Sequence, residues 1–123
     1  MNVKEIGETL VQLCRQGKNM ESINRLYAEE VESVEAAKPP LGERVTKGIE
    51  GVRQKNMAWS EMNIVNSHGV EGPYPHGDDR FAVRFSYDVT QKASGQRMKL
   101  DEIALFTLAH GKIVREEFFY QMG

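Results

Sequence analysis

The last third of the chain reads as three consecutive strands joined by two short turns that contain Gly95 and Gly111. The strands are expected over residues 81–91, 97–108 and 113–121. Because such short turns join antiparallel neighbours, the segment predicts an antiparallel meander. Aromatic residues alternate with polar ones along it, which is typical of a curved sheet with one covered face. The rest of the chain must therefore pack against that face.

The preceding part of the chain predicts three helices. Apolar residues recur at helical spacing in residues 3–16 and 19–27, and Gly17 between them is a typical helix stop. A third helix is expected over residues 46–60. Three helices followed by a strand meander predict an α+β fold, with the helices packed on one face of a curved, mostly antiparallel sheet.

Two intervening segments have weaker patterns. Residues 27–35 place Val31 and Val34 among glutamates, which indicates a short edge strand or an irregular segment. A further strand is expected over residues 62–70, running into a loop at 71–79. That loop is too rich in proline to form a central strand.

Composition and charge narrow the class of protein. A chain of 123 residues suits a single domain over 1–123, and its net charge of -2 without a basic run argues against nucleic-acid binding. No apolar run approaches the roughly 20 residues that cross a bilayer, so no membrane insertion is expected. The single Cys14 lies on the apolar face of the first predicted helix and is expected in the core. Without a signal-like N-terminus or an internal disulfide, we expect a cytoplasmic protein.

The meander strands differ in how their faces alternate. In the first strand, Phe81, Val83 and Phe85 point to one side, which we expect to face the helices. The middle strand is apolar on both faces over residues 103–108. Because helices cover only one face, a second subunit is the simplest cover for the other, and we expect a homodimer through the sheet. The alternative is a C-terminal strand that curls over itself.

Together these segments resemble the nuclear-transport-factor-2-like, or SnoaL-like, superfamily of cone-shaped, cystatin-like α+β domains. The resemblance rests on residues 23–30, where a helix runs into a strand, on 81–85, and on 105–108 leading into 110–114. It covers nearly the whole chain. Members include cofactor-free isomerases, dehydratases, epoxide hydrolases and polyketide cyclases, and also transport and binding modules without catalysis. The fold alone therefore does not choose the function.

The resemblance also implies which residues of the last two strands face inward. When Gly111 is matched to the hairpin of the family, the inward-facing residues of the middle strand are Glu102, Ala104, Phe106 and Leu108. Those of the last strand are then Glu116, Phe118 and Tyr120. Two carboxylates in an apolar cavity raise the pKa of at least one of them, which is the usual preparation for acid-base chemistry. The alternative is that Glu102 and Glu116, near strand ends, are solvated. A slip of one residue would replace Glu102 by Asp101.

One specific activity of the superfamily is disfavoured by the residues present. The tyrosine donor of ketosteroid isomerases corresponds to Leu10, and their protonated aspartate to Ala104. Their base carboxylate corresponds to Glu35 when the match is counted from Tyr27, and to Ala36 when it is aligned on Val34 and Glu35. Because both donors to the oxyanion are missing, the isomerase chemistry of that family is not expected.

Histidines supply a further candidate base. His68 is in phase with Ile64 and Val70, so it either enters the cavity as a base or forms a hydrogen-bonded wall. His76, in the proline-rich loop, either closes over a ligand or decorates a turn. No metal is expected, because HxH, HxxxH and CxxC spacings are absent from the sequence. No nucleotide or other cofactor motif is present either.

The combined prediction is an apolar cavity between the helices and the sheet that binds a small, largely apolar organic molecule. The residues expected to line it are Tyr27, Trp59, Phe81, Val83, Phe85, Phe106, Phe118 and Tyr120. Glu102, Glu116 and His68 are the catalytic candidates for a cofactor-free isomerase, dehydratase or cyclase that acts by proton transfer. The competing hypothesis is a non-catalytic module for ligand binding or dimerisation, favoured by the missing donors at Leu10 and Ala104.

Overall fold

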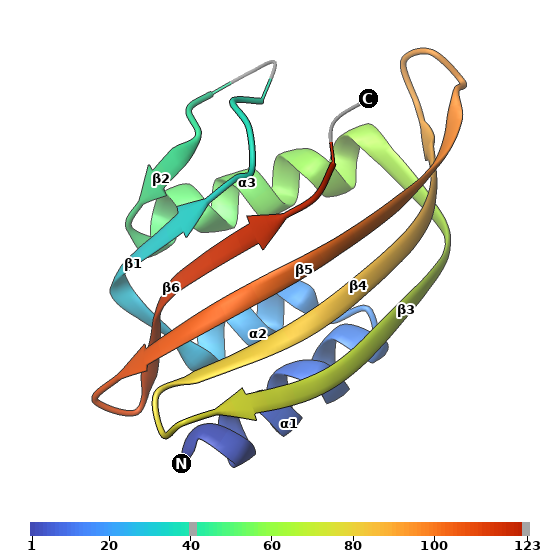
Figure 1. Cartoon of the computed structure of the whole chain (residues 1–123). Helices are drawn as coiled ribbons and strands as arrows, with labels where there is room; N and C mark the ends of the chain where they lie inside the picture. The colour runs from blue at the N-terminus through green and yellow to red at the C-terminus, as the bar shows by residue number, and fades with distance from the viewer. Residues whose placement is uncertain (40–41, 122–123) are drawn as a thin grey trace.

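The described part of the chain folds into three helices and one six-stranded sheet (Figure 1). The computed structural model describes residues 1–39 and 42–121. Within these residues the elements follow in the order α1 (Val3–Arg15), α2 (Asn19–Leu26), β1 (Tyr27–Val34), β2 (Val45–Lys47), α3 (Ile49–Met62), β3 (Asn63–His76), β4 (Arg80–Gln91), β5 (Arg97–Ala109) and β6 (Lys112–Phe119). The predicted fold class, with helices packed on a curved, mostly antiparallel sheet, is confirmed.

The strands pair in the order β2-β1-β6-β5-β4-β3, and the curved sheet is open. β4, β5 and β6 form the predicted antiparallel meander, and β1 lies parallel to β6. The edge-strand interpretation of residues 27–35 is wrong, because β2 covers the outer side of β1 through pairs such as Glu32 with Lys47. β2 could not be predicted from the sequence, because its three residues lie just before α3 and continue the helical spacing of apolar residues.

The predicted loop at 71–79 is also corrected. β3 continues to His76 and includes both Pro73 and Pro75. β3 is the edge strand beside β4, so it needs hydrogen bonds on one side only. A proline, which has no N–H to donate, is tolerated there. The pairing of β3 with β4 shifts between Glu71 and Tyr74, and this irregularity accommodates the proline in the strand.

The first helix begins and ends where its sequence indicates. The side chain of Asn2 accepts a hydrogen bond from the Glu5 N–H at 2.9 Å, and the Glu5 carboxylate accepts one from the Asn2 N–H at 3.1 Å. Gly17 follows the last turn with φ 74°, a conformation that glycine adopts at little cost. In the described part of the chain, no helix has the length and apolarity needed to cross a membrane.

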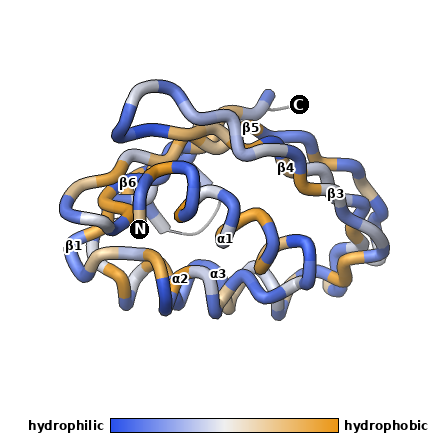
Figure 2. The backbone as a smooth tube through the Cα atoms, turned by 90° about the horizontal axis from the view of Figure 1, so that it is seen from below, coloured by the Kyte–Doolittle hydropathy of each residue, from blue (hydrophilic) through white to orange (hydrophobic). Residues whose placement is uncertain are grey.

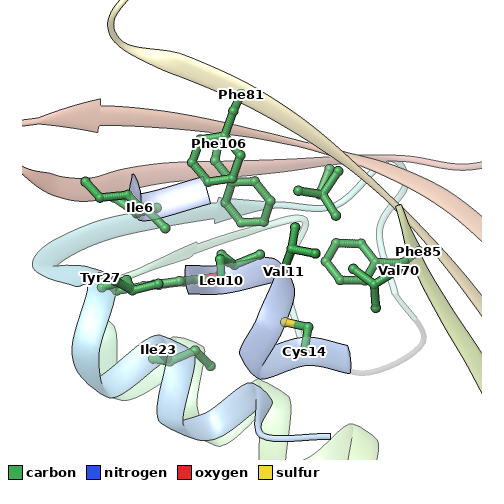
Figure 3. Packing of buried hydrophobic residues seen from close by; sticks show 14 of the residues in the cluster. Ile6, Leu10, Val11, Cys14, Ile23, Tyr27, Val70, Phe81, Phe85 and Phe106 are labelled. Atoms are coloured by element: carbon green, nitrogen blue, oxygen red, sulfur yellow. The ribbon is translucent and has the colours of Figure 1, made fainter. Parts of the chain in front are cut away.

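α1 lies inside the curve of the sheet and supplies much of the core (Figure 2). Ile6 and Leu10 of α1 pack against Phe81 and Phe106, and all four are 0–1 % exposed (Figure 3). The rings of Phe81 and Phe106 stack with their centres 4.9 Å apart. Cys14 is 5 % exposed, so the prediction that it lies in the core is confirmed.

The outer face of the sheet carries both charge pairs and exposed apolar side chains. Ile103 and Phe119 are 40 % and 48 % exposed and lie directly opposite each other on β5 and β6. Arg84 forms a two-pronged ion pair with Asp101 beside them. The described chain thus leaves apolar residues of β5 and β6 open on this face. A homodimer through the sheet stays a prediction.

Candidate functional site

Glu116 is a buried carboxylate on the inner face of β6, with 5 % of the residue exposed. A regular alternation from the buried Ile113 would have turned Arg115 inward instead. The pairing with β5 shifts here, from Leu108 with Ile113 to Thr107 with Arg115, so Val114 is an extra residue in the strand. Such a bulge reverses the alternation beyond it. It is the reason that Glu116 faces the interior.

Both oxygens of Glu116 accept hydrogen bonds from β1. The hydroxyl of Tyr27 donates to Oε1, and the hydroxyl of Ser33 donates to Oε2 at 2.6 Å. The parallel pairing of β1 with β6 places Ser33 directly beside Glu116. A buried carboxylate with donors on both oxygens is satisfied without water.

A second layer of polar side chains extends from Ser33 toward the surface. Lys55 of α3 donates to Ser33 Oγ at 2.5 Å and to Glu35 Oε1 at 2.9 Å. Tyr120 donates to the other oxygen of Glu35 at 3.0 Å. The ammonium of Lys55 also lies 5.5 Å from the centre of the Phe118 ring, within the range of a cation-π contact. We refer to Tyr27, Ser33, Glu35, Lys55, Glu102, Glu116 and Tyr120 as the carboxylate cluster.

Glu102 is the half-buried carboxyl of the cluster. It lies on β5 directly opposite Phe85 of β4. No hydrogen bond or ion pair to its side chain is formed within residues 1–39 and 42–121. Burial, followed by the charges of Glu35 and Glu116, raises the pKa of Glu102 to about 7. The carboxyl therefore changes its charge near neutral pH.

Burial and hydrogen bonding also raise the pKa values of three other members of the cluster, Glu116, Tyr27 and Tyr120. Burial raises the pKa of Glu116 above its usual value, and the hydrogen bonds from Ser33 and Tyr27 and the charge of Lys55 only partly oppose this rise. Burial and the neighbouring Glu116 raise the pKa of Tyr27 well above its usual range, so Tyr27 stays a donor. Burial and the hydrogen bond to Glu35 raise the pKa of Tyr120 to about 12.

Comparison with known proteins places this geometry in a family. A family model described as a SnoaL-like domain matches residues 1–120. The chain belongs to the SnoaL-like domain family. A solved structure from Mesorhizobium loti, provisionally named a SnoaL-like polyketide cyclase, is 41 % identical and has a TM-score of 0.91. That match covers 98 % of this chain and 100 % of the other.

More distant solved structures share the fold of this SnoaL-like domain. A provisionally named isomerase from Bacillus subtilis has a TM-score of 0.80 at 14 % identity, covering 98 % of this chain and 90 % of the other. A Catenulispora acidiphila protein with a ketosteroid isomerase-like fold, solved in complex with trimethylamine, has a TM-score of 0.73 at 18 % identity. That match covers 96 % and 86 % of the two chains. None of the curated proteins searched matches this chain.

The residues predicted to line a cavity separate into two groups in this SnoaL-like domain. Four of them pack tightly against the helices and are at most 5 % exposed: Phe81, Val83, Phe85 and Phe106. Tyr27 is also buried and bonded to Glu116, whereas Trp59, Phe118 and Tyr120 are half-buried. Two surface hollows lie apart from the cluster, one between α1 and Pro73 and one beside the N-terminus. The cavity stays a prediction, centred on the half-buried group.

His68 lies away from the hydrogen bonds of the cluster. It is exposed on β3, and its Nε2 lies 3.1 Å from the carbonyl oxygen of Arg15. Because a carbonyl only accepts, His68 donates to the open C-terminal end of α1. His76 is exposed at the end of β3. No group of three or more potential ligands within the described ranges could hold a metal ion.

Sequence reasoning missed Ser33 and Lys55. A serine in a strand and a lysine in a helix are ordinarily solvated, so neither residue stands out by type. The available signals were their spacings: Ser33 alternates with the apolar Val31, and Lys55 lies three residues after Val52 and four before Trp59. Those spacings place them on covered faces.

The positions of the missing isomerase donors are part of the apolar core. Leu10 is 1 % exposed and Ala104 is 0 % exposed, and both belong to the main hydrophobic cluster. The hydroxyls that donate to Glu116 come from β1 instead, through Tyr27 and Ser33.

Proposed function

We propose that this SnoaL-like domain binds a small, largely apolar organic molecule and moves a proton on it without a cofactor, as in isomerisation, dehydration or cyclisation. The observation that carries the proposal is Glu102, a half-buried carboxyl whose side chain has no hydrogen-bond or ion-pair partner among the described residues and whose pKa is about 7. A group that titrates near the operating pH is the most effective proton carrier. Glu102 is therefore assigned as the general base, which later returns the proton as an acid.

The other predicted site residues take supporting roles in this proposal. Glu116 contributes negative charge, which helps to raise the pKa of Glu102. Trp59, Phe118 and Tyr120 are half-buried and contact the apolar part of the ligand. The packed residues form the wall behind them: Tyr27, Phe81, Val83, Phe85 and Phe106. His68, bound to the end of α1, is assigned no proton-transfer step.

Related structures support the class of reaction. The Mesorhizobium loti structure carries the provisional name of a SnoaL-like polyketide cyclase, and the Bacillus subtilis structure that of an isomerase. The Catenulispora acidiphila neighbour was solved with a small organic molecule, trimethylamine. The proposal for this chain agrees with these names but rests on its own carboxylates.

A non-catalytic ligand-binding or dimerisation module is the second candidate. It is favoured by Leu10 and Ala104, which leave the site without the oxyanion donors of the isomerases. It is also favoured by the exposed pair Ile103 and Phe119, for which a second copy of the chain is the proposed cover. We propose a cytoplasmic location, with which the single, buried free thiol of Cys14 is compatible.

Hydrogen exchange in D₂O tests the two candidates. The protein is incubated with a panel of small cyclic ketones and β-diketones, and incorporation of deuterium at carbon is followed by mass spectrometry. Catalysis predicts exchange that grows as pH rises toward about 7 and then levels, because the anionic form of Glu102 is the base. Glu102→Gln should lose this exchange, by roughly 100-fold or more.

Asp101→Asn is the matched control for that experiment, because Asp101 precedes Glu102 and pairs with Arg84 on the outer face. It should leave exchange nearly unchanged, because the charge of Asp101 is the smallest of the influences that raise the pKa of Glu102. Ligands that bind without exchange in the wild-type protein, or exchange that survives Glu102→Gln, would favour the binding module.

A further inference from the structure

The direction of the hydrogen bond between Ser33 and Glu116 depends on whether the buried carboxyl is ionised or protonated. A serine hydroxyl has one proton and rotates freely, so it can donate to a carboxylate or accept from a protonated carboxyl. The short contact from Ser33 Oγ to Glu116 Oε2, at 2.6 Å, is compatible with either. Something else must therefore orient the hydroxyl of Ser33.

Lys55 supplies that orientation. Its Nζ lies 2.5 Å from Ser33 Oγ and 2.9 Å from Glu35 Oε1. An ammonium group has only donors, so Ser33 Oγ must accept from Lys55. A hydroxyl oxygen can accept twice, but Glu116 Oε2 is the acceptor that the described residues offer to the Ser33 proton, so Ser33 directs that proton to Glu116. Tyr27 donates to the other oxygen of Glu116, so the whole arrangement suits an acceptor-only carboxylate.

We propose that Lys55 is a positioning residue, which fixes the direction of the Lys55–Ser33–Glu116 hydrogen-bond chain and thereby holds Glu116 as an anion. Glu116 is then a fixed charge, and Glu102 is the carboxyl that exchanges the proton. Only this assignment to Glu102 rests on the proposed function. The charge state of Glu116 is a property of the folded protein without a ligand.

The charged and titratable groups around Glu116 come from all the elements that pack against it. They are Cys14 of α1, Tyr27 and Glu35 of β1, Lys55 of α3 and Glu102 of β5. Burial raises the pKa of Cys14 to about 11, so this thiol is neutral, as is Tyr27. Of these groups Lys55 is the only cation. It therefore opposes the effect of burial, which favours a neutral Glu116.

A carboxyl titration tests the inference directly. The ¹³C signals of the glutamate side chains are followed against pH, and the signal of Glu116 is assigned with Glu116→Gln. Lys55→Met should raise the midpoint of Glu116 by about one pH unit or more, because it removes both the cation and the constraint on Ser33. Lys55→Arg should restore most of the original midpoint, since arginine is also a donor without an acceptor.

Two further variants keep the experiment decisive. Lys47→Met removes an exposed lysine of β2 and should leave the titration of Glu116 unchanged. Ser33→Ala keeps the charge of Lys55 but breaks the chain, and it should also raise the midpoint. An unchanged midpoint in Ser33→Ala would overturn the hydrogen-bond chain. An unchanged midpoint in Lys55→Met, or an equal shift in Lys47→Met, would overturn the role of Lys55.

The outcome is separable from that of the proposed function, because the titration needs no substrate. A predicted response of Glu116 together with no deuterium exchange would refute proton transfer and leave the role of Lys55 intact. Deuterium exchange that depends on Glu102, with no response of Glu116 to Lys55→Met, would do the opposite.

Discussion

Two halves of the same inner sheet face are built on opposite principles. Beneath α1, Phe81 and Phe106 stack with their ring centres 4.9 Å apart and make no polar contact through their side chains. Beside β1, the buried Glu116 accepts hydrogen bonds from two hydroxyls, and Lys55 of α3 reaches it through Ser33. The first half gains free energy by removing apolar area from water. The second must offset the desolvation of a carboxyl with hydrogen bonds and opposite charge.

The difference teaches where stability and function reside. An apolar core residue can be replaced by another apolar residue of similar volume at a modest cost in stability. A buried carboxyl loses stability when even one hydrogen-bond partner is removed, because a carboxyl oxygen is then left without a hydrogen bond in a medium of low dielectric. The polar half is therefore expected to be the less stabilising and the more specific of the two.

The largest expected effect is in the apolar half. Phe106→Ala should lower the free energy of unfolding by about 4 kcal/mol, because it leaves a cavity opposite Phe81. Urea unfolding measures this difference. Phe119→Ala is the matched control, since Phe119 is 48 % exposed and should cost much less. Equal costs for the two variants would show that Phe106 is not part of a packed core in solution.

The next effect is in the polar half. Tyr27→Phe should lower the free energy of unfolding by about 2 kcal/mol, because Oε1 of the buried Glu116 loses its donor. Tyr120→Phe is the comparison, as its hydroxyl serves the less buried Glu35 and should matter less. In the double variant with Glu116→Gln, the cost of Tyr27→Phe should shrink. An undiminished cost would mean that the hydroxyl of Tyr27 is not coupled to the carboxyl.

An effect of comparable size appears as pH dependence. Folding raises the pKa of Glu102 from 4.5 to about 7, so its contribution to stability is fully present below about 4.5 and is lost as pH rises through about 7. The wild-type protein should lose about 3 kcal/mol of stability over this window relative to Glu102→Gln. Urea unfolding at a series of pH values measures it. Parallel curves for the two proteins would contradict the raised pKa.

The smallest effect is on the outer face. Arg97 pairs with Asp88 at 2.8 Å, but 67 % of the Arg97 side chain is exposed. Because water and salt screen such a pair, Arg97→Gln should leave the unfolding midpoint close to that of the wild type, and closer still in high salt. A loss of unfolding free energy as large as that of Tyr27→Phe would show that buried and exposed polar contacts contribute equally to stability.

The patterns that the sequence could reveal are local ones. Helical spacing predicted α1 and its end at Gly17, and alternation predicted the strands of the meander. These features depend on residues close together in the chain, which share one face of an element. Residues 71–79 were misjudged because the tolerance of a strand for proline depends on whether it lies at a sheet edge.

The carboxylate cluster was only partly predictable. Glu102 and Glu116 were placed inward through the family resemblance, since alternation from Ile113 alone would have turned Glu116 outward. The bulge at Val114 that corrects this is visible only in the pairing of β5 with β6. Ser33 and Lys55 became part of the site only when β1, β6 and α3 were brought together.

The sequence by itself determined an α+β domain with an aromatic inner sheet face, because periodicity and turns encode which residues share a face. The tertiary structure decided that this face has a packed apolar half and a polar half. It did so because contacts between Lys55, Ser33 and Glu116 join three elements that are distant in the chain. Burial and neighbouring charge, which set the pKa of Glu102, likewise exist only after those elements have packed.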